Sequence, residues 1–223
     1  MIYLFSDEAG KERLKIKGEN YKYLIKVRRH KEGDTIFLRN QIDRKQLYMY
    51  KISSVDGRSV ELALISSQEQ EVKAQKELHV GWCLIDSKSI EKVLPTLSEI
   101  GVTKISFITC ERSQRNFKLD FKRFERILEA SMQQSGRSTF IEFDTYKSVQ
   151  DFIEAFPQTK VFDFSDTILE QVEDMRTVLV GCEGGFSPDE KEFLAKQEVF
   201  RLDTPMILRS ESAVVAIASK VLF

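Results

Sequence analysis

The sequence is poor in the residues that dominate disordered, collagen-like and disulfide-stapled proteins. It has ten glycines and four prolines among 223 residues, too few for a collagen-like or low-complexity chain. Hydrophobic residues make up 42% and charged residues 31%, which is typical of an ordinary folded protein. The length fits one large domain or a small domain joined to a medium one, because domains usually run ~100–200 residues.

Cysteine and histidine are also scarce. Cys83, Cys110 and Cys182 are odd in number and far apart in the sequence, which favours buried thiols over a disulfide framework or a zinc cluster. His30 and His79 are the only histidines, and neither has a second ligand at helical spacing. The sequence therefore predicts no metal site and argues against a metal-dependent hydrolase.

Long hydrophobic runs are absent. The longest, 213–223, is interrupted by Ser219 and Lys220 and is shorter than the ~18 residues that indicate a membrane span. The first eight residues, MIYLFSDE, place acid where a secretory signal carries positive charge. We expect a cytoplasmic chain without a membrane helix.

The net charge of −1 conceals an uneven distribution. Residues 1–72 hold 14 basic and 11 acidic side chains, and residues 73–223 hold 20 and 24. Between positions 11 and 31, nine basic residues face only Glu12 and Glu19, and a second basic run covers 112–126. One such run is often a solvated face, but two favour a polyanion partner. The candidate contacts are Lys22, Lys26, Arg28, Arg29, Lys31 and, in the second run, Arg115.

The hydrophobic pattern changes near residue 72. Before it, the sequence predicts strands at 2–5, 35–39, 47–55 and 59–65 and a helix at 20–29, an arrangement that resembles a small barrel. The polar segment 66–77 is the best candidate for a linker. We therefore predict domains at 1–72 and 73–223.

The second part alternates strands with helices. The sequence predicts strands at 78–85, 105–109, 140–143, 161–164, 178–181 and 200–202, and helices at 90–100, 121–134, 149–156, 188–196 and from 210 on. This alternation indicates an α/β fold with a largely parallel sheet covered by helices. Ligands on such sheets bind at the carboxyl ends of the strands.

Two loops at predicted strand ends carry the strongest signals. In Gly181-Cys-Glu-Gly-Gly-Phe-Ser-Pro-Asp-Glu190, a glycine loop leads into a helix with Ser187 as N-cap and Glu190 completing a capping box. Such a loop lets a ligand approach the backbone, or is simply a tight turn. It has neither the Walker nor the dinucleotide-binding spacing. In the second loop, 202–209, Ser210 is the candidate cap of a buried, apolar last helix.

These two loops resemble the paired signature of the SPOUT methyltransferases, in particular the RsmE family. The match rests on Gly181-Cys-Glu-Gly-Gly-Phe-Ser and Ile207-Leu-Arg-Ser-Glu-Ser-Ala, with further family-like stretches in order at 27–34, 98–102, 109–113 and 129–137. Three positions depart from the family pattern: Cys182 stands in place of the usual Pro, Ser212 in place of Thr and Ile100 in place of Leu. Of these, only Cys182 changes the stiffness of the glycine loop.

The resemblance implies methylation of N3 of a uridine in 16S ribosomal RNA, with S-adenosyl-L-methionine as cofactor. It also implies a front PUA-like RNA-binding barrel, a C-terminal trefoil knot, a homodimer and a substrate within the assembled 30S subunit. Cofactor contacts are expected mainly through main-chain groups, at Leu179, Gly181, Glu183, Gly184, Gly185, Leu202, Ile207, Leu208, Arg209 and Ala213. Glu183 is a candidate for the ribose hydroxyls or for the amino group of the cofactor.

Few catalytic side chains are needed, because the cofactor carries its own electrophile. Arg112 and Arg137 are candidates to stabilise the uridine anion, including across a dimer, or else to anchor phosphate. Arginine does not act as a base, so the proton acceptor is Glu211, Glu183 or water. Arg209 alternatively forms a structural pair with Glu211.

Other interpretations are a ribose 2′-hydroxyl methyltransferase, a noncatalytic ribosome-assembly factor and a nucleotide-dependent oxidoreductase. The front domain favours uridine N3, the intact loop glycines argue against loss of activity, and the missing fingerprint argues against an oxidoreductase.

Overall fold

The computed structural model describes residues 3–114, 118–170 and 175–223. It divides into two compact units, which are described separately: residues 1–73 with 132–139, and residues 74–131 with 140–223. The predicted boundary near residue 72 did not assign 132–139 to the first unit.

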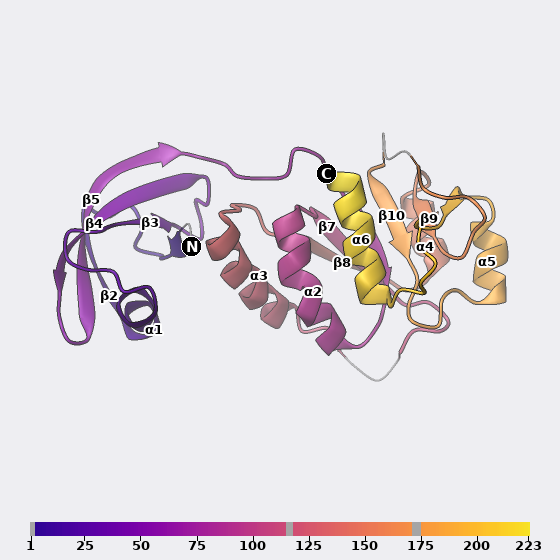
Figure 1. Cartoon of the computed structure of the whole chain (residues 1–223), viewed down its shortest axis with the longest axis horizontal. Helices are drawn as coiled ribbons and strands as arrows, with labels where there is room; N and C mark the ends of the chain where they lie inside the picture. The colour runs from indigo at the N-terminus through magenta and orange to yellow at the C-terminus, as the bar shows by residue number, and fades with distance from the viewer. Residues whose placement is uncertain (1–2, 115–117, 171–174) are drawn as a thin grey trace. The chain divides into compact units, whose positions relative to one another are not determined.

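The first unit is a curled five-stranded sheet (Figure 1). Its strands lie in the order β1-β3-β4-β5-β2, where only the β1–β3 pair is parallel. The strands are β1 (Leu4–Phe5), β2 (Arg13–Lys17), β3 (Thr35–Arg39), β4 (Gln46–Val55) and β5 (Ser59–Glu69). Between β2 and β3 the chain forms helix α1 (Gly18–Tyr21), which continues as the π-helix η1 (Lys22–Val27).

Two expectations for this unit were wrong in detail. Strand β2 was not predicted, although Leu14 and Ile16 alternate with exposed basic residues and are both buried. The supposed linker 66–77 begins inside β5, which runs to Glu69. Burial of one face explains β2, because an edge strand needs only a few inward apolar residues. The end of β5 is exposed, and it forms because residues 66–69 pair with the first residues of β4.

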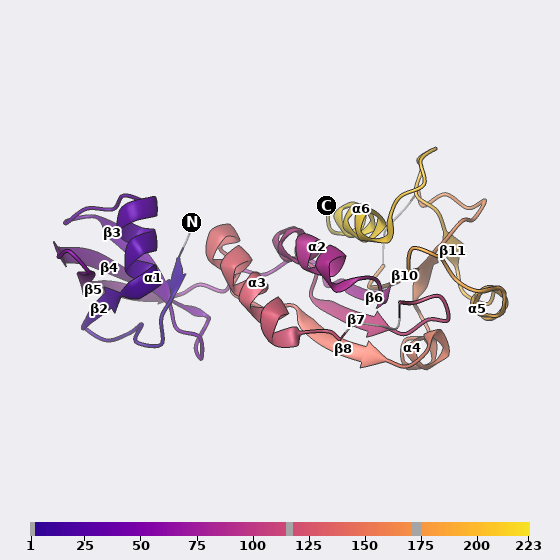
Figure 2. The same cartoon turned by 90° about the horizontal axis from the view of Figure 1, so that it is seen from below.

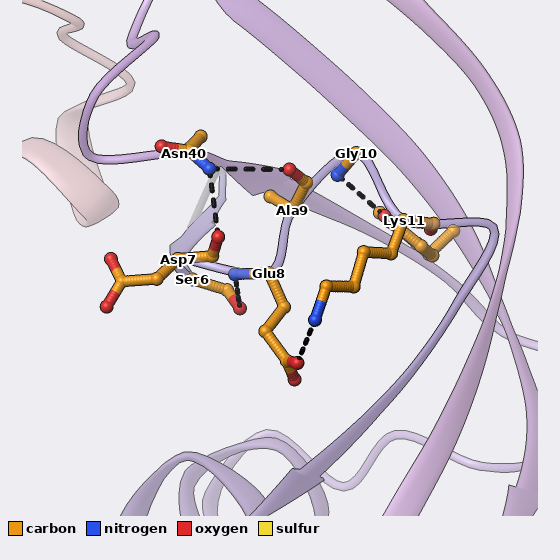
Figure 3. Close-up of polar contacts among 8 residues, drawn as sticks. Ser6, Asp7, Glu8, Ala9, Gly10, Lys11 and Asn40 are labelled. Atoms are coloured by element: carbon orange, nitrogen blue, oxygen red, sulfur yellow. Dashed lines mark hydrogen bonds and ion pairs between the residues drawn. The ribbon is translucent and has the colours of Figure 1, made fainter.

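The loop between β1 and β2 is held down by polar contacts (Figure 3). The Asn40 side-chain amide donates to the backbone oxygens of Asp7 and Ala9, at 3.0 and 3.4 Å. Gly10 has a φ of +107°, which favours glycine, and its N–H donates to Tyr50 Oη at 2.9 Å. The loop is therefore fixed to the body of the sheet.

The second unit is built on six parallel strands, as predicted. Their order is β11-β9-β10-β6-β7-β8. The strands are β6 (His79–Cys83), β7 (Lys104–Ile108), β8 (Glu142–Tyr146), β9 (Lys160–Phe162), β10 (Thr177–Val180) and β11 (Val199–Phe200). The helices are α2 (Ser87–Ile100), α3 (Phe121–Ser135), α4 (Val149–Ala155), α5 (Pro188–Leu194) and α6 (Ser210–Leu222), where the end of α3 belongs to the first unit.

Alternate residues of β6 face different helices, because successive side chains of a strand point to opposite faces. Trp82 contacts α6 through Ser210. Gly81 has no room for a side chain, since a Cβ there would lie 2.5 Å from Phe152 of α4. Helices α2 and α6 lie side by side (Figure 2). Within the described ranges, no helix is long and apolar enough to cross a membrane.

Candidate active site

The glycine loop lies beyond the carboxyl end of β10, at the switch in strand order that the α/β rule favours for ligands. Its end is fixed by the predicted capping box, since Ser187 Oγ accepts from Glu190 N and a Glu190 oxygen accepts from Ser187 N. Gly185 has a φ of +65°, a conformation that favours glycine. The loop therefore has a defined shape.

The loop before α6 forms the facing wall. Ser210 was predicted to cap α6, and this was wrong: Arg209 occupies the N-cap position without a side-chain cap bond. The Ser210 hydroxyl instead donates to Gly181 O at 2.6 Å and accepts from Trp82 Nε1 at 2.8 Å. Ser210 thus ties the glycine loop to the first turn of α6.

Between these loops is a cavity of about 330 Å³, a size typical of small-molecule sites. It opens beyond the ends of β9, β10 and β11, which are adjacent in the sheet. Aromatic side chains line it from Phe162, Phe164 and Phe200, and charged ones from Asp163, Glu183, Arg201 and Arg209. A flat ring system with polar substituents fits this combination.

Most residues that were expected to bind cofactor line this cavity: Gly181, Glu183, Gly185, Leu202, Ile207, Leu208, Arg209 and Ala213. Two do not. Leu179 is fully buried in the core within β10. Gly184 faces Arg112, whose Cβ would lie 3.3 Å from a Cβ at position 184. A role of Leu179 or Gly184 in cofactor binding would therefore act through neighbouring residues that line the cavity.

Sequence reasoning missed one wall entirely. The segment 162–164 and the residues Phe200, Arg201, Thr204 and Met206 also line the cavity. The available signal was that 161–164 was predicted as a strand, and strand ends of a parallel sheet meet at one edge. Val180, Cys182, Ser210 and Ile217 complete the lining.

A second loop, 109–114 after β7, is fastened to the glycine loop and to α5. Three hydrogen bonds join them: Glu111 N to Glu190 Oε1 at 3.0 Å, Arg112 Nη1 to Gly184 O at 2.8 Å, and Gln114 Nε2 to Glu183 Oε2 at 3.2 Å. Arg112 is exposed, so its guanidinium keeps donors for a further group. The structure thus places Arg112, the candidate for stabilising the uridine anion, beside the glycine loop.

All three cysteines are buried and unbridged. Cys110 Sγ and Cys182 Sγ lie 3.5 Å apart, and Cys110 Sγ lies 3.1 Å from Ser113 Oγ. The neighbouring Cys182 and Cys83 side chains lower the pKa of Cys110, while Cys110 and burial raise the pKa of Cys182 and burial raises the pKa of Cys83. Together with Glu190, the thiols link the 109–114 loop to the glycine loop.

The other two catalytic candidates lie apart from the cavity lining. Glu211 stands in the first turn of α6, 4.0 Å from Arg209 Nη1. Its Oε2 is buried and has no hydrogen-bond partner among the described residues. Arg137 belongs to the first unit, where its buried Nε donates to Thr139 O at 2.6 Å, and burial lowers its pKa to about 10.

Five of the predicted polyanion contacts are exposed in the first unit: Lys22, Lys26, Arg28, Arg29 and Lys31. Lys22 pairs with Glu19 at 2.7 Å, and the Arg28 guanidinium lies 6.0 Å from the ring centre of Tyr23. Arg29 has a φ of +60°. The sixth, Arg115, lies outside the described residues.

Comparison with known proteins extends over both units. Residues 72–222 match an RNA methyltransferase domain and residues 16–65 an RNA methyltransferase PUA domain. The chain is 36% identical to ribosomal RNA small subunit methyltransferase E of Helicobacter pylori J99, over 98% of both chains. It is 25% identical to the enzyme of that name from Aquifex aeolicus, again over 98% of both.

Solved structures share the fold. A Legionella pneumophila protein in complex with SAM has a TM-score of 0.76 at 20% identity, covering 99% of this chain and 96% of that one. Ribosomal RNA small subunit methyltransferase E from Neisseria gonorrhoeae, bound to S-adenosyl methionine, has a TM-score of 0.75 at 18% identity with the same coverage.

Proposed function

This chain belongs to the family of ribosomal RNA small subunit methyltransferase E, and on that premise we propose that it methylates N3 of a uridine in small-subunit ribosomal RNA. It is an rRNA methyltransferase that uses S-adenosyl-L-methionine, and its front part is an RNA-binding PUA domain. The observation that carries the finer proposal is the cavity at the glycine loop, to which the Arg112 loop is fastened.

The residues of the cavity fit the cofactor. Phe162, Phe164 and Phe200 offer apolar faces for a purine ring. The backbone of 181–185 supplies polar groups without bulk. Asp163 and Glu183 are acidic groups for the ribose hydroxyls or the amino group. When bound, S-adenosylmethionine supplies an electrophilic methyl group.

Uridine must be unpaired to react, because N3 lies on the pairing edge of the base and carries a proton. Loss of that proton places negative charge on the ring, which a nearby cation stabilises. We assign this role to Arg112, since its guanidinium is exposed and is held at the glycine loop by Gly184 O. The buried Arg137, bonded to Thr139, is the second candidate.

The proton acceptor is proposed among Glu211, Glu183 and water. Glu183 lines the cavity and is exposed. Glu211 carries a buried oxygen with no partner in the described part of the chain, and such an oxygen is a ready acceptor.

We further propose the assembly that the family resemblance implies. The chain acts as a cytoplasmic homodimer with a C-terminal trefoil knot, on uridine within the assembled 30S subunit. Residues 1–72 bind RNA, and residues 73–223 hold the cofactor. Light scattering of the purified protein tests the dimer directly.

The proposed function is tested by incubating the purified protein with labelled S-adenosylmethionine and small ribosomal subunits from cells that lack the enzyme. The RNA is digested and the labelled nucleoside is identified. We expect 3-methyluridine. Label in another nucleoside would contradict the N3 assignment, and no label despite cofactor binding would favour a noncatalytic role.

A variant pair tests the role of Arg112. Arg112→Ala should lower kcat by about 10²-fold or more, as loss of one charge-stabilising donor does. The affinity for cofactor should change much less, since Arg112 does not line the cavity. Lys88→Ala, at an exposed lysine of α2, is the control.

A further inference from the structure

Cys110 and Cys182 form a thiol pair at the base of the glycine loop. Their sulfur atoms lie 3.5 Å apart although the residues are 72 positions apart in sequence. A disulfide requires an S–S distance of about 2.0 Å, so the two sulfurs need to approach by about 1.5 Å. Neither is bridged in this structure.

Access differs among the three cysteines. Cys182 lines the cavity and is 8% exposed, which makes it the most accessible of the three cysteines. Cys110 is 2% exposed and Cys83 is fully buried, and neither lines the cavity. Cys182 is thus placed to react first and Cys110 to react with it.

We propose that a hydroperoxide oxidises this pair to a reversible Cys110–Cys182 disulfide, and that the disulfide opposes binding of S-adenosylmethionine. The effect on the cofactor rests on the proposed function, whereas formation of the disulfide does not.

The chemistry balances in two steps. Cys182 Sγ attacks one oxygen of hydrogen peroxide, the O–O bond breaks, and a sulfenic acid and one water form. Cys110 Sγ then attacks Cys182 Sγ, and the hydroxyl leaves with the Cys110 proton as a second water. Two thiols are oxidised by two electrons and the peroxide is reduced to two waters. A dithiol reverses the reaction.

Access decides which sulfur meets the peroxide first, and electrostatics bear on the second step. The neighbouring Cys182, Cys83 and Ser113 side chains lower the pKa of Cys110, whereas Cys110 and burial raise the pKa of Cys182. Thiolate is the attacking form of cysteine, so Cys110 is the better of the two to displace water from an oxidised Cys182.

The bond would change the loop that forms the cavity wall. In the reduced protein the Cys182 thiol lies 3.4 Å from Gly185 O as a donor, and Gly185 N donates to Cys182 O at 2.9 Å. Disulfide formation removes the thiol hydrogen and draws Cys182 toward the 109–114 loop. The neighbouring Gly181 O is already held by Ser210, so the strain falls on 182–185.

Two effects couple cofactor and disulfide. A bound ligand in the cavity covers Cys182, and the oxidised loop no longer has the shape of the reduced wall. By linkage, the factor by which oxidation weakens cofactor binding equals the factor by which cofactor disfavours oxidation.

Peptide mapping is the direct test. Cleavage after lysine and arginine separates the three cysteines into the peptides 77–88, 105–112 and 177–191. After treatment of the reduced protein with hydrogen peroxide, we expect 105–112 joined to 177–191, lighter by two hydrogens, and separated again by dithiothreitol. A dominant link to 77–88, or sulfinic acid without any link, would overturn the proposal.

Cofactor affinity is measured next, by calorimetry on reduced and oxidised protein. We expect oxidation to weaken binding about tenfold or more, within the usual range of coupling between sites. Cys110→Ser is the control, and the ratio of treated to untreated affinity is compared within each variant. The Cys110→Ser variant retains Met206, which lines the cavity. Any loss of affinity that comes from oxidation of Met206 therefore appears in both proteins, and dithiothreitol does not reverse it.

Linkage adds an independent readout. Tenfold coupling should raise the midpoint potential of the disulfide by about 30 mV when saturating S-adenosylmethionine is present. A disulfide that forms but leaves both affinity and potential unchanged would refute its control of the site. Failure of the reduced wild-type protein to bind cofactor would instead contradict the proposed function. The two failures are distinguishable, because peptide mapping detects the disulfide whether or not the protein binds cofactor.

Discussion

A single hydroxyl connects three parts of the second unit. Ser210 is 5% exposed, donates to Gly181 O and accepts from the indole N–H of Trp82, which is fully buried. Removing the hydroxyl leaves the buried Trp82 N–H and the half-buried Gly181 carbonyl without this partner, and unsatisfied buried groups are destabilising.

We therefore expect Ser210→Ala to lower the free energy of unfolding by about 1–3 kcal/mol and to weaken binding of S-adenosylmethionine. Denaturant titration and calorimetry measure the two effects. Ser219→Ala is the matched control, because the Ser219 hydroxyl donates to Val215 O within the same helix. Equal losses of cofactor affinity in both variants would show that Ser210 does not position the loop.

His79 is a second residue with a predictable effect. It is 8% exposed, bonds Ser106 Oγ at 2.7 Å and packs against the edges of Phe152 and Phe156. Burial, with a smaller effect of Lys104, lowers its pKa to about 4. The unfolded chain binds the His79 proton near its ordinary pKa of about 6.5.

The sign follows from the two pKa values. Between pH 6.5 and 4 the unfolded state binds more protons than the folded state, so stability falls as pH decreases. This loss should reach at most about 1.4 kcal/mol per pH unit from His79. Thermal unfolding at several pH values should show a shallower slope for His79→Gln than for the unchanged protein, and equal slopes would contradict this role of His79.

At the scale of elements, Glu190 joins α5 to two loops. It is 2% exposed, and its two carboxylate oxygens accept from Glu111 N and Ser187 N. The first bond holds the 109–114 loop, and the second closes the capping box. The position of Arg112, in the 109–114 loop, therefore depends on a residue of helix α5.

Glu190→Ala should lower the free energy of unfolding by about 3 kcal/mol, because hydrogen bonds to charged groups contribute about 1.5–3 kcal/mol each. Methyl transfer should fall more than cofactor affinity, since Arg112 is displaced while the cavity lining remains. Asp189→Ala, at an exposed residue of the same turn, is the control. Similar activity in the two variants would remove Glu190 from this positioning role.

Elements were predictable where a pattern was local. Strand β3 was predicted with its observed bounds, and the Ser187 cap followed from spacing alone. Strand β2 was missed because its alternating Arg13, Lys15 and Lys17 were interpreted only as a charge run. Strand β8 begins two residues after the predicted start, because register depends on the neighbour β7.

At the scale of the whole molecule, the two units carry different charge. The basic run of the first unit is exposed at Arg28, Arg29 and Lys31. Each side chain that neutralises a phosphate releases a counterion, so binding weakens as salt rises. We propose that this run supplies much of the affinity for RNA.

Replacing Arg28, Arg29 and Lys31 by alanine should weaken RNA binding and flatten its salt dependence, by about one unit of slope for each lost phosphate contact. Fluorescence titration at several salt concentrations measures the slope. The control replaces Lys88, Lys92 and Lys147, which are exposed in the second unit. If the salt dependence of RNA binding were unchanged in the first variant, the basic run would be a solvated surface that does not contact RNA.

The parallel α/β class, the glycine loop and its capped helix could be predicted from the order of residues alone, because periodicity and capping depend on neighbours within a few residues. The family followed from motifs in order along the chain. Three sets of contacts could be known only from the folded chain: Phe162 and Phe200 line one cavity with the glycine loop, Ser210 bonds Gly181, and Cys110 contacts Cys182. These contacts depend on the order of strands in the sheet, where β10 lies between β9 and β6, and no local pattern encodes that order.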